Sequence, residues 1–89
     1  MDIIEIYTSR NCPKCELLKR FLKNKGIQFK ERNIEDPENL TDAIMLDIYT
    51  VPAIVKGSKV LRVEDLFDGG ALKEDVILRF LSGDENESR

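Results

Sequence analysis

The fold is decided within residues 3–26, which read IIEIYTSRNCPKCELLKRFLKNKG. This stretch opens with β-branched and aromatic residues at 3–7, a pattern typical of a buried strand. A short polar turn follows, and Cys12-Pro13 then begins a helix, because proline at the first helical position lacks only an amide donor that the helix does not use. Gly26 predicts the C-terminal end of the helix. The first thirty residues therefore form strand, turn and helix.

The rest of the chain continues this alternation. Strands are predicted at 27–33, 51–55 and 60–63, a helix at 37–48, and a last helix whose apolar face runs from Leu72 to Leu81. The turn at 56–59 makes the last two strands an antiparallel hairpin, and 64–70 is predicted to be a loop. The order is β-α-β-α-β-β-α. We therefore expect an α/β fold in which three helices flank a mixed four-stranded sheet.

Length and composition limit the class of protein. Of 89 residues, 42% are hydrophobic and 35% are charged, which suits one small globular domain. We expect this domain to span residues 1–82 and the polar residues 83–89 to form a disordered tail. The formal net charge of −3 gives no general basic surface for a nucleic acid.

The same reasoning addresses membranes and compartment. No apolar run approaches the ~20 residues of a membrane helix. Acidic residues stand near the N-terminus, where a secretory signal would carry basic ones. We therefore expect a cytoplasmic protein without a membrane or nucleic-acid partner, and we expect it to be a monomer.

The chemistry is indicated by Cys12 and Cys15, which lie three positions apart at the start of the predicted helix. Amide donors at a helix N-terminus point at the first sulfur, and the helix dipole favours an anion there by roughly 0.3–1 kcal/mol. Since one pKa unit is about 1.4 kcal/mol, this placement lowers the expected pKa of Cys12 by ~1. Arg10 and Lys14 add positive potential. The thiolate is the species that attacks, so Cys12 is the candidate nucleophile.

Cys15 has a different predicted role. One turn into the helix, its sulfur is expected to be more buried, and it can attack a mixed disulfide at Cys12, release the reduced substrate and leave a Cys12–Cys15 disulfide. This exchange needs no metal or organic cofactor. The chain has no histidine, so a zinc site would need a second chain or carboxylate ligands. A redox sensor, or a dimer bridged by zinc or an iron–sulfur cluster, is the alternative function.

Two landmarks together make the pattern specific. Residues 6–8 (Ile-Tyr-Thr) precede a short loop and the Cys-Pro-Lys-Cys motif at 12–15, and Thr50-Val51-Pro52 follows at the predicted third strand. In this order and spacing they resemble glutaredoxin and the glutaredoxin-like redoxins of the thioredoxin superfamily, over nearly the whole chain. The resemblance implies a thioredoxin-like fold of the glutaredoxin type and a small dithiol–disulfide oxidoreductase that reduces protein disulfides.

The resemblance also implies roles for the second landmark. It implies a cis peptide bond between Val51 and Pro52, beside the cysteines. It further implies that the backbone of Val51 pairs with an extended substrate as one added strand. The candidate substrate-binding residues are Arg10, Pro13, Lys14, Thr50, Val51, Pro52, Gly69 and Gly70.

The electron donor is the point at which the chain departs from the family. Glutaredoxins place a lysine three residues before the first cysteine to hold a glutathione carboxylate; here that position is Ser9, with Arg10 as a substitute. Gly69-Gly70 resembles the glycine pair before the helix that holds the γ-glutamyl end of glutathione, but the residues after it are more similar to the last helix of thioredoxin. Glutathione is a possible co-substrate, and these departures favour a thioredoxin-reductase-type donor.

Overall fold

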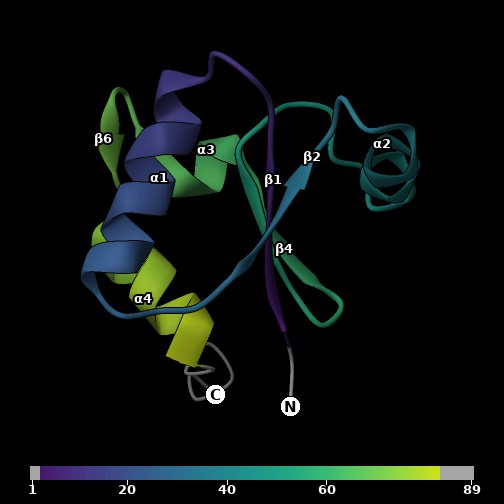
Figure 1. The fold of residues 1–89 in the computed structure, drawn as a ribbon. Helices are drawn as coiled ribbons and strands as arrows, with labels where there is room; N and C mark the ends of the chain where they lie inside the picture. The colour runs from purple at the N-terminus through teal and green to yellow at the C-terminus, as the bar shows by residue number, and fades with distance from the viewer. Residues whose placement is uncertain (1–2, 83–89) are drawn as a thin grey trace.

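A four-stranded sheet lies at the centre of the computed structural model, which describes residues 3–82 (Figure 1). Its strands are β1 (Ile4–Thr8), β2 (Lys30–Asn33), β3 (Ala53–Lys56) and β4 (Lys59–Leu61), in the spatial order β2-β1-β3-β4. β1 is parallel to β2 and antiparallel to β3, and β3 is antiparallel to β4. The predicted mixed sheet is confirmed. The predicted tail at 83–89 lies outside the described residues.

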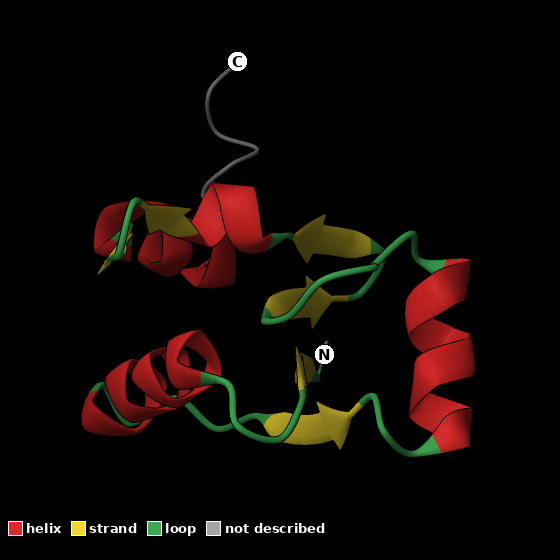
Figure 2. Ribbon diagram, turned by 90° about the horizontal axis from the view of Figure 1, so that it is seen from above, coloured by secondary structure: helices red, strands yellow, loops and turns green. Residues whose placement is uncertain are grey.

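Helices cover both faces of this sheet. α1 (Pro13–Asn24), the short α3 (Val63–Leu66) and α4 (Glu74–Ser82) lie on one face, and α2 (Pro37–Met45) lies on the other (Figure 1). Figure 2 shows α2 along its length, whereas Figure 1 shows it end-on, so α2 crosses the general direction of β1. Within residues 3–82, no helix has the length and apolar character needed to span a membrane.

Both long helices of the first half begin as their sequences predict. Pro13 and Pro37 each occupy the first turn of a helix, α1 and α2 respectively. The Asp36 side chain caps α2 by accepting a hydrogen bond from the Glu38 amide at 3.2 Å. Gly26 follows α1 with a φ of 71°, a left-handed conformation that ends a helix at little cost for glycine.

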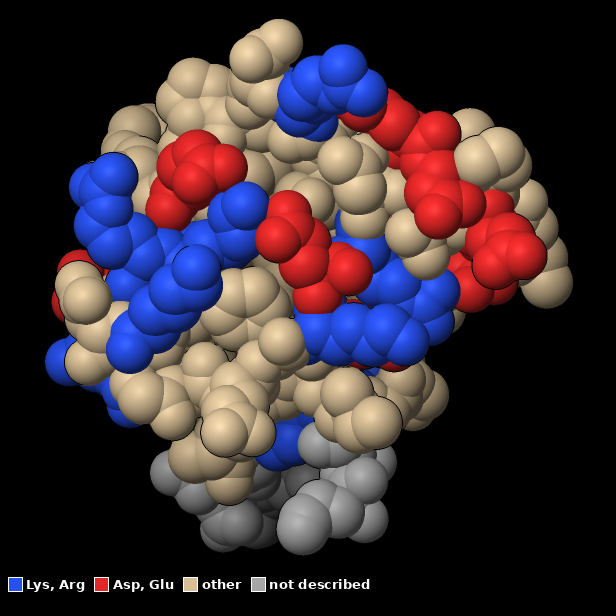
Figure 3. All heavy atoms as spheres, viewed as in Figure 1, with Lys and Arg blue, Asp and Glu red and all other residues tan. Residues whose placement is uncertain are grey.

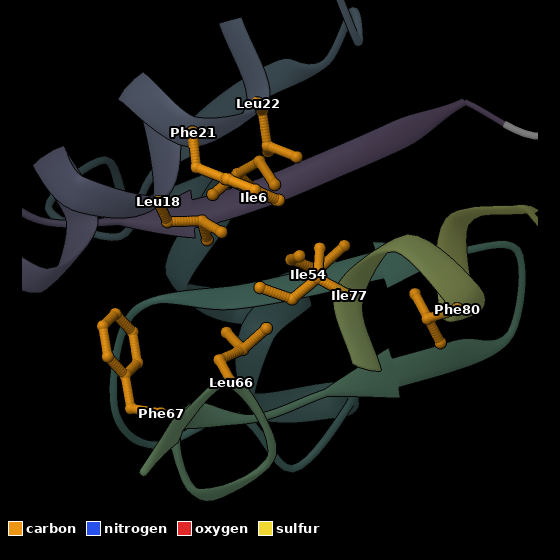
Figure 4. Close-up of a cluster of buried hydrophobic side chains, with 9 residues drawn as sticks. All are labelled: Ile6, Leu18, Phe21, Leu22, Ile54, Leu66, Phe67, Ile77 and Phe80. Carbon is orange, nitrogen blue, oxygen red and sulfur yellow. The ribbon is translucent and has the colours of Figure 1, made fainter. Parts of the chain in front are cut away.

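The sheet separates two hydrophobic clusters. Successive residues of a strand point to opposite faces, so Ile6 belongs to the cluster under α1 and Tyr7 to the cluster under α2. The first cluster (Figure 4) consists of Ile6, Leu18, Phe21, Leu22, Ile54, Leu66, Phe67, Ile77 and Phe80. The second consists of Tyr7, Ala43, Ile48, Ala53 and Val55. Both clusters anchor the end of β1, where the chain enters the cysteine motif.

The prediction of a loop at 64–70 is wrong. Part of this segment forms α3, and the Asp65 side chain accepts a hydrogen bond from the Arg62 amide at 3.0 Å before the helix. The rest begins a two-stranded hairpin of β5 (Phe67–Asp68) and β6 (Ala71–Leu72). Leu66 and Phe67 are buried in the first cluster. Burial of these two side chains orders the segment, which is too short for a helical or strand periodicity to show in its sequence.

Several element boundaries also differ from prediction: β3 begins at Ala53 instead of 51, and β4 ends at Leu61 instead of 63 because Val63 begins α3. β2 begins at Lys30 instead of 27, and α4 begins at Glu74. α2 ends at Met45 instead of 48, because Asp47 adopts a φ of 60° that leaves the helix. Ile48 is still buried, in the second cluster, so the apolar signal that extended the predicted helix reflects packing after the turn.

Candidate active site

Cys12 stands immediately before α1 and acts as its N-cap residue. Its backbone is extended, with φ −119° and ψ 98°, and its Sγ accepts a hydrogen bond from the Cys15 amide at 3.1 Å. The first amides of a helix have no partner within the helix, so a sulfur at this position receives donors and the positive end of the helix dipole. The structure thus places the sulfur of Cys12 where the sequence predicts it.

Cys12 and Cys15 form a disulfide, with their Cα atoms 5.2 Å apart. The two sulfurs are not equally accessible: Cys12 is partly exposed, whereas Cys15 has 0% exposure. A thiol that approaches from solvent can therefore reach Cys12 and not Cys15. This difference in burial would allow attack at one sulfur and release by the other.

The segment Thr50-Val51-Pro52 lies at the same edge of the sheet as the cysteine loop. Ala53 pairs with Tyr7, so the antiparallel register places Pro52 opposite Thr8, at the end of β1. The Val51-Pro52 peptide bond is cis, as the resemblance implies. Pro52 is buried, Val51 is partly exposed and Thr50 is exposed. Thr50 and Val51 are consequently accessible to a partner beside the motif.

The two cations predicted to surround Cys12 both have partners from distant parts of the chain. The Nζ of Lys14 lies 5.3 Å from the ring centroid of Phe67, a cation–π contact that links α1 to β5. The Arg10 side chain forms an ion pair with Glu35, at 3.0 Å between Nε and Oε1. The sequence analysis missed Phe67 and Glu35, because neither lies near the cysteines in sequence.

Gly69 and Gly70 form the exposed turn between β5 and β6. α4 begins at Glu74, so the glycine pair is separated from the start of that helix by β6. The Lys14–Phe67 contact and the view in Figure 1 place this hairpin beside the start of α1. The hairpin therefore lies near the cysteine motif, but not as the lead-in to a helix N-terminus.

A buried polar group lies at the end of β1. The Oγ1 of Thr8, which is 1% exposed, donates a hydrogen bond to Glu31 Oε2 at 2.9 Å. Lys19, one turn after Cys15 on α1, donates to the same oxygen at 3.0 Å. Hydrogen bonding to Glu31 raises the pKa of Lys19, although burial opposes it. This ion pair fastens α1 to β2 beside the motif.

No group of three or more His, Cys, Asp or Glu side chains able to hold a metal occurs among residues 3–82. The described site contains two sulfurs joined in one disulfide. Comparison with known proteins agrees with this chemistry: the glutaredoxin family model matches residues 4–61. The chain belongs to the glutaredoxin family. Members of this glutaredoxin-like group are thiol–disulfide oxidoreductases, and so is this chain.

Two NrdH proteins are similar to this glutaredoxin. The glutaredoxin-like protein NrdH of Lactococcus lactis subsp. cremoris (strain MG1363) is 33% identical over 55 residues, which cover 61% of this chain and 76% of the relative. The NrdH-redoxin of Escherichia coli superposes with a TM-score of 0.60 at 27% identity, covering 66% of this chain and 79% of that one.

A solved structure matches a larger share of this chain than the family model does. A variant of the thioredoxin-like protein BC3987 superposes with a TM-score of 0.71 and covers 88% of this chain and 97% of its own. At 22% identity this likeness shows the fold alone. The thioredoxin-like fold is thereby confirmed over a longer part of the chain than the family model covers.

Proposed function

We propose that this glutaredoxin reduces protein disulfides, with Cys12 as the attacking sulfur and Cys15 as the resolving sulfur. One observation carries the assignment: the sulfur that receives the amide of the first helical turn, at 3.1 Å, is also the accessible one, while its partner is fully buried. A sulfur at a helix N-terminus is favoured as the thiolate, and the thiolate is the nucleophile in disulfide exchange.

The exchange proceeds in two steps. The Cys12 thiolate attacks one sulfur of the client disulfide, forms a bond to it, and expels the other client sulfur, which takes up a proton. The Cys15 thiol then loses its proton and attacks Cys12 Sγ, forming the Cys12–Cys15 disulfide and expelling the second client thiol. The client gains two electrons from the cysteine pair and two protons, one from the Cys15 thiol and one from solvent, which took up the Cys12 proton when that thiol ionised. The disulfide in the structure corresponds to the product of this sequence.

Residues around the sulfurs position the client in this proposal. The backbone of Thr50, an exposed residue, and of Val51, a partly exposed one, pairs with an extended client segment beside the buried cis-Pro52. Pro13 and Lys14 are exposed at the start of α1 and contact the same client. The β5–β6 hairpin, with Gly69 and Gly70 at its turn, contacts the client from a second side. Lys14 links α1 to this hairpin through its contact with the Phe67 ring.

The electron donor in this proposal is a thioredoxin-reductase-type enzyme. Ser9 stands where glutaredoxins carry the lysine that holds a glutathione carboxylate. The glycine pair is separated from α4 by β6, so it does not offer that helix N-terminus to a γ-glutamyl group. The E. coli NrdH-redoxin, which shares this fold, is described by its thioredoxin-like activity profile. These three observations support a protein donor.

Single-cysteine variants test the roles of the two sulfurs. Cys15→Ser is expected to accumulate a mixed disulfide between Cys12 and a client such as insulin, because the resolving step is removed. Cys12→Ser is the matched control and is expected to form no adduct and to reduce no insulin. Mass spectrometry of the adduct and NADPH-coupled turnover with thioredoxin reductase are the measurements. Insulin reduction by Cys12→Ser at the wild-type rate contradicts the assignment.

A further inference from the structure

Both oxygens of the Glu35 carboxylate are engaged by Arg10. The Arg10 backbone amide donates to Glu35 Oε2 at 3.1 Å, and the Arg10 Nε donates to Oε1 at 3.0 Å. Arg10 is two residues before Cys12, so their Cα atoms are at most about 7 Å apart. Arg10, the cation on the N-terminal side of the attacking sulfur, is therefore already paired with an acid of the same chain.

The Glu35 carboxylate is held at this place by an ordered turn between β2 and α2. The Ile34 amide donates to the Thr8 carbonyl at 2.8 Å, which joins this turn to the end of β1. The Glu35 amide donates to Asn33 Oδ1 at 2.8 Å, and the Asp36 amide donates to the Asn33 carbonyl at 3.0 Å. Glu35 is thus presented to the cysteine loop by backbone contacts on both sides.

The chain segment that carries Glu35 is itself acidic. The segment from 33 to 55 contains five acidic residues and no lysine or arginine. In Figure 3, acidic side chains gather toward α2 at the upper right, and basic side chains gather over α1 at the left. Arg32 on β2 pairs with one of these acids, Asp42. An anionic group that approaches Cys12 from the α2 side still meets an excess of acidic side chains, because Arg10 is already paired with Glu35.

We propose that Glu35 is a specificity-determining residue that disfavours glutathione, and other small thiols with a carboxylate on this side, at Cys12. The inference rests on the proposed thiol–disulfide exchange at that sulfur. A carboxylate that binds Arg10 must displace Glu35 or lie beside it. Two carboxylates about 4 Å apart in water repel by about 1 kcal/mol, a roughly five-fold loss of affinity. Thiols without a carboxylate, and protein donors that avoid this side, escape the repulsion.

The reaction that reports this discrimination is reduction of the oxidised protein. A glutathione thiolate attacks Cys12 Sγ, because Cys15 is fully buried, and it forms a Cys12–glutathione bond while the Cys15 thiolate leaves and takes up a proton. A second glutathione thiolate attacks the glutathione sulfur of this bond and releases glutathione disulfide and the Cys12 thiolate. Two glutathione molecules are oxidised and one protein disulfide is reduced.

A two-by-two comparison of proteins and thiols tests the proposal. The second-order rate of disulfide reduction is measured for wild type and Glu35→Gln, each with glutathione and with its monoethyl ester, in which the glycyl carboxylate is neutral. We expect Glu35→Gln to raise the rate with glutathione by a factor roughly five times larger than the factor for the ester. Glu38→Gln removes an exposed acid of the same segment that does not contact Arg10, and a gain below about two-fold is expected.

Three results overturn the proposal. In the first, Glu35→Gln does not raise the rate of reduction by glutathione. In the second, the substitution raises the rate with the ester as much as the rate with glutathione. In the third, Glu38→Gln raises the rate with glutathione as much as Glu35→Gln does. If Glu35→Gln does not fold, the salt dependence of the wild-type protein decides: the ester is expected to react faster than glutathione at low salt and to lose this advantage near 1 M salt, where screening is strong. If the ester reacts faster than glutathione by the same factor at every salt concentration, electrostatic repulsion by Glu35 is rejected.

The proposed function is tested separately, so the two failures are distinguishable. Wild-type protein with NADPH and thioredoxin reductase either reduces insulin or does not, and this result does not involve glutathione. If insulin reduction fails while the glutathione comparison behaves as expected, the donor or client assignment is wrong and the role of Glu35 is retained. If insulin is reduced and the comparison shows no charge effect, only the role of Glu35 is rejected.

Discussion

At the scale of single residues, the environment of Cys12 is built by contacts between residues distant in sequence. Glu31 on β2 accepts hydrogen bonds from Thr8 Oγ1 at 2.9 Å and from Lys19 Nζ at 3.0 Å. Burial raises the pKa of the Glu31 carboxyl, but the hydrogen bonds from Lys19 and Thr8 lower it by more, so the net pKa is below its usual value. The folded protein therefore favours the ionised Glu31.

This lowered pKa predicts how Glu31 contributes to stability as pH changes. A carboxyl whose folded pKa is below its unfolded value, about 4.3, stabilises the protein above that value, and the contribution is lost as pH falls through the folded pKa. We expect Glu31→Gln to lower the free energy of unfolding at pH 7 by at most about 1 kcal/mol, because the side chain is 42% exposed.

Urea denaturation at pH 7 and pH 3 is the measurement for Glu31. The difference between wild type and Glu31→Gln is expected to be smaller at pH 3 than at pH 7, because the contribution of the ionised carboxyl is lost as pH falls through the folded pKa. An equal difference at both pH values rejects an electrostatic role and indicates that the substitution acts through packing alone.

At the scale of elements, a single arginine, the residue between β4 and α3, joins this junction to the end of α2. Arg62 donates from Nη2 to the Leu46 carbonyl at 2.7 Å and from Nε to the Asp47 carbonyl at 3.1 Å. These carbonyls lie at the C-terminal end of α2, which has no basic residue in its last turn. A cation there satisfies free carbonyls and the negative end of the helix dipole.

We expect Arg62→Met to destabilise the protein by about 1–2 kcal/mol, since it leaves two carbonyls with fewer donors. Hydrogen exchange of the amides at 46–50 is expected to accelerate more than exchange in α1. Arg20→Met, on the exposed face of α1, is the matched control and should change stability by less than about 0.5 kcal/mol. Equal effects of the two substitutions contradict the assignment.

The β5–β6 turn offers a second matched pair at this scale. Gly69 has a φ of +64°, whereas Gly70 has no such constraint, and an added Cβ meets no atom within 4 Å at either position. Gly69→Ala is therefore expected to cost about 1 kcal/mol through backbone conformation alone, and Gly70→Ala to change stability by less than about 0.5 kcal/mol. The urea midpoints of the two variants are the measurement. A larger loss in Gly70→Ala contradicts the turn geometry.

These elements also show what sequence patterns can predict. β1, α1 and the Cys12–Cys15 pair were predictable because strand residues, proline at the helix start and the cysteine spacing are all local signals. The α3 and β5–β6 segment was not, since its order comes from burial of Leu66 and Phe67 in the first cluster. The Arg10–Glu35 and Arg62–Leu46 contacts join residues 25 and 16 positions apart, and no local pattern encodes them.

At the scale of the whole molecule, the topology brings the functional residues to one edge of the sheet. β1 ends at this edge, where the chain continues into the loop that carries Cys12, and β3 begins there after cis-Pro52. The turn before α2, which carries Glu35, joins the same edge through Thr8. The two hydrophobic clusters hold β1 from both faces, so the position of Cys12 depends on packing throughout the domain.

The central claim is that the amides at the start of α1 keep Cys12 ionised near neutral pH. Its most direct test is the pH dependence of the iodoacetamide alkylation rate of reduced Cys15→Ser protein, in which Cys12 is the only thiol. The account predicts a midpoint below the ~8.5 of an ordinary thiol, because the helix N-terminus favours the thiolate. A midpoint at 8.5 or above contradicts the claim.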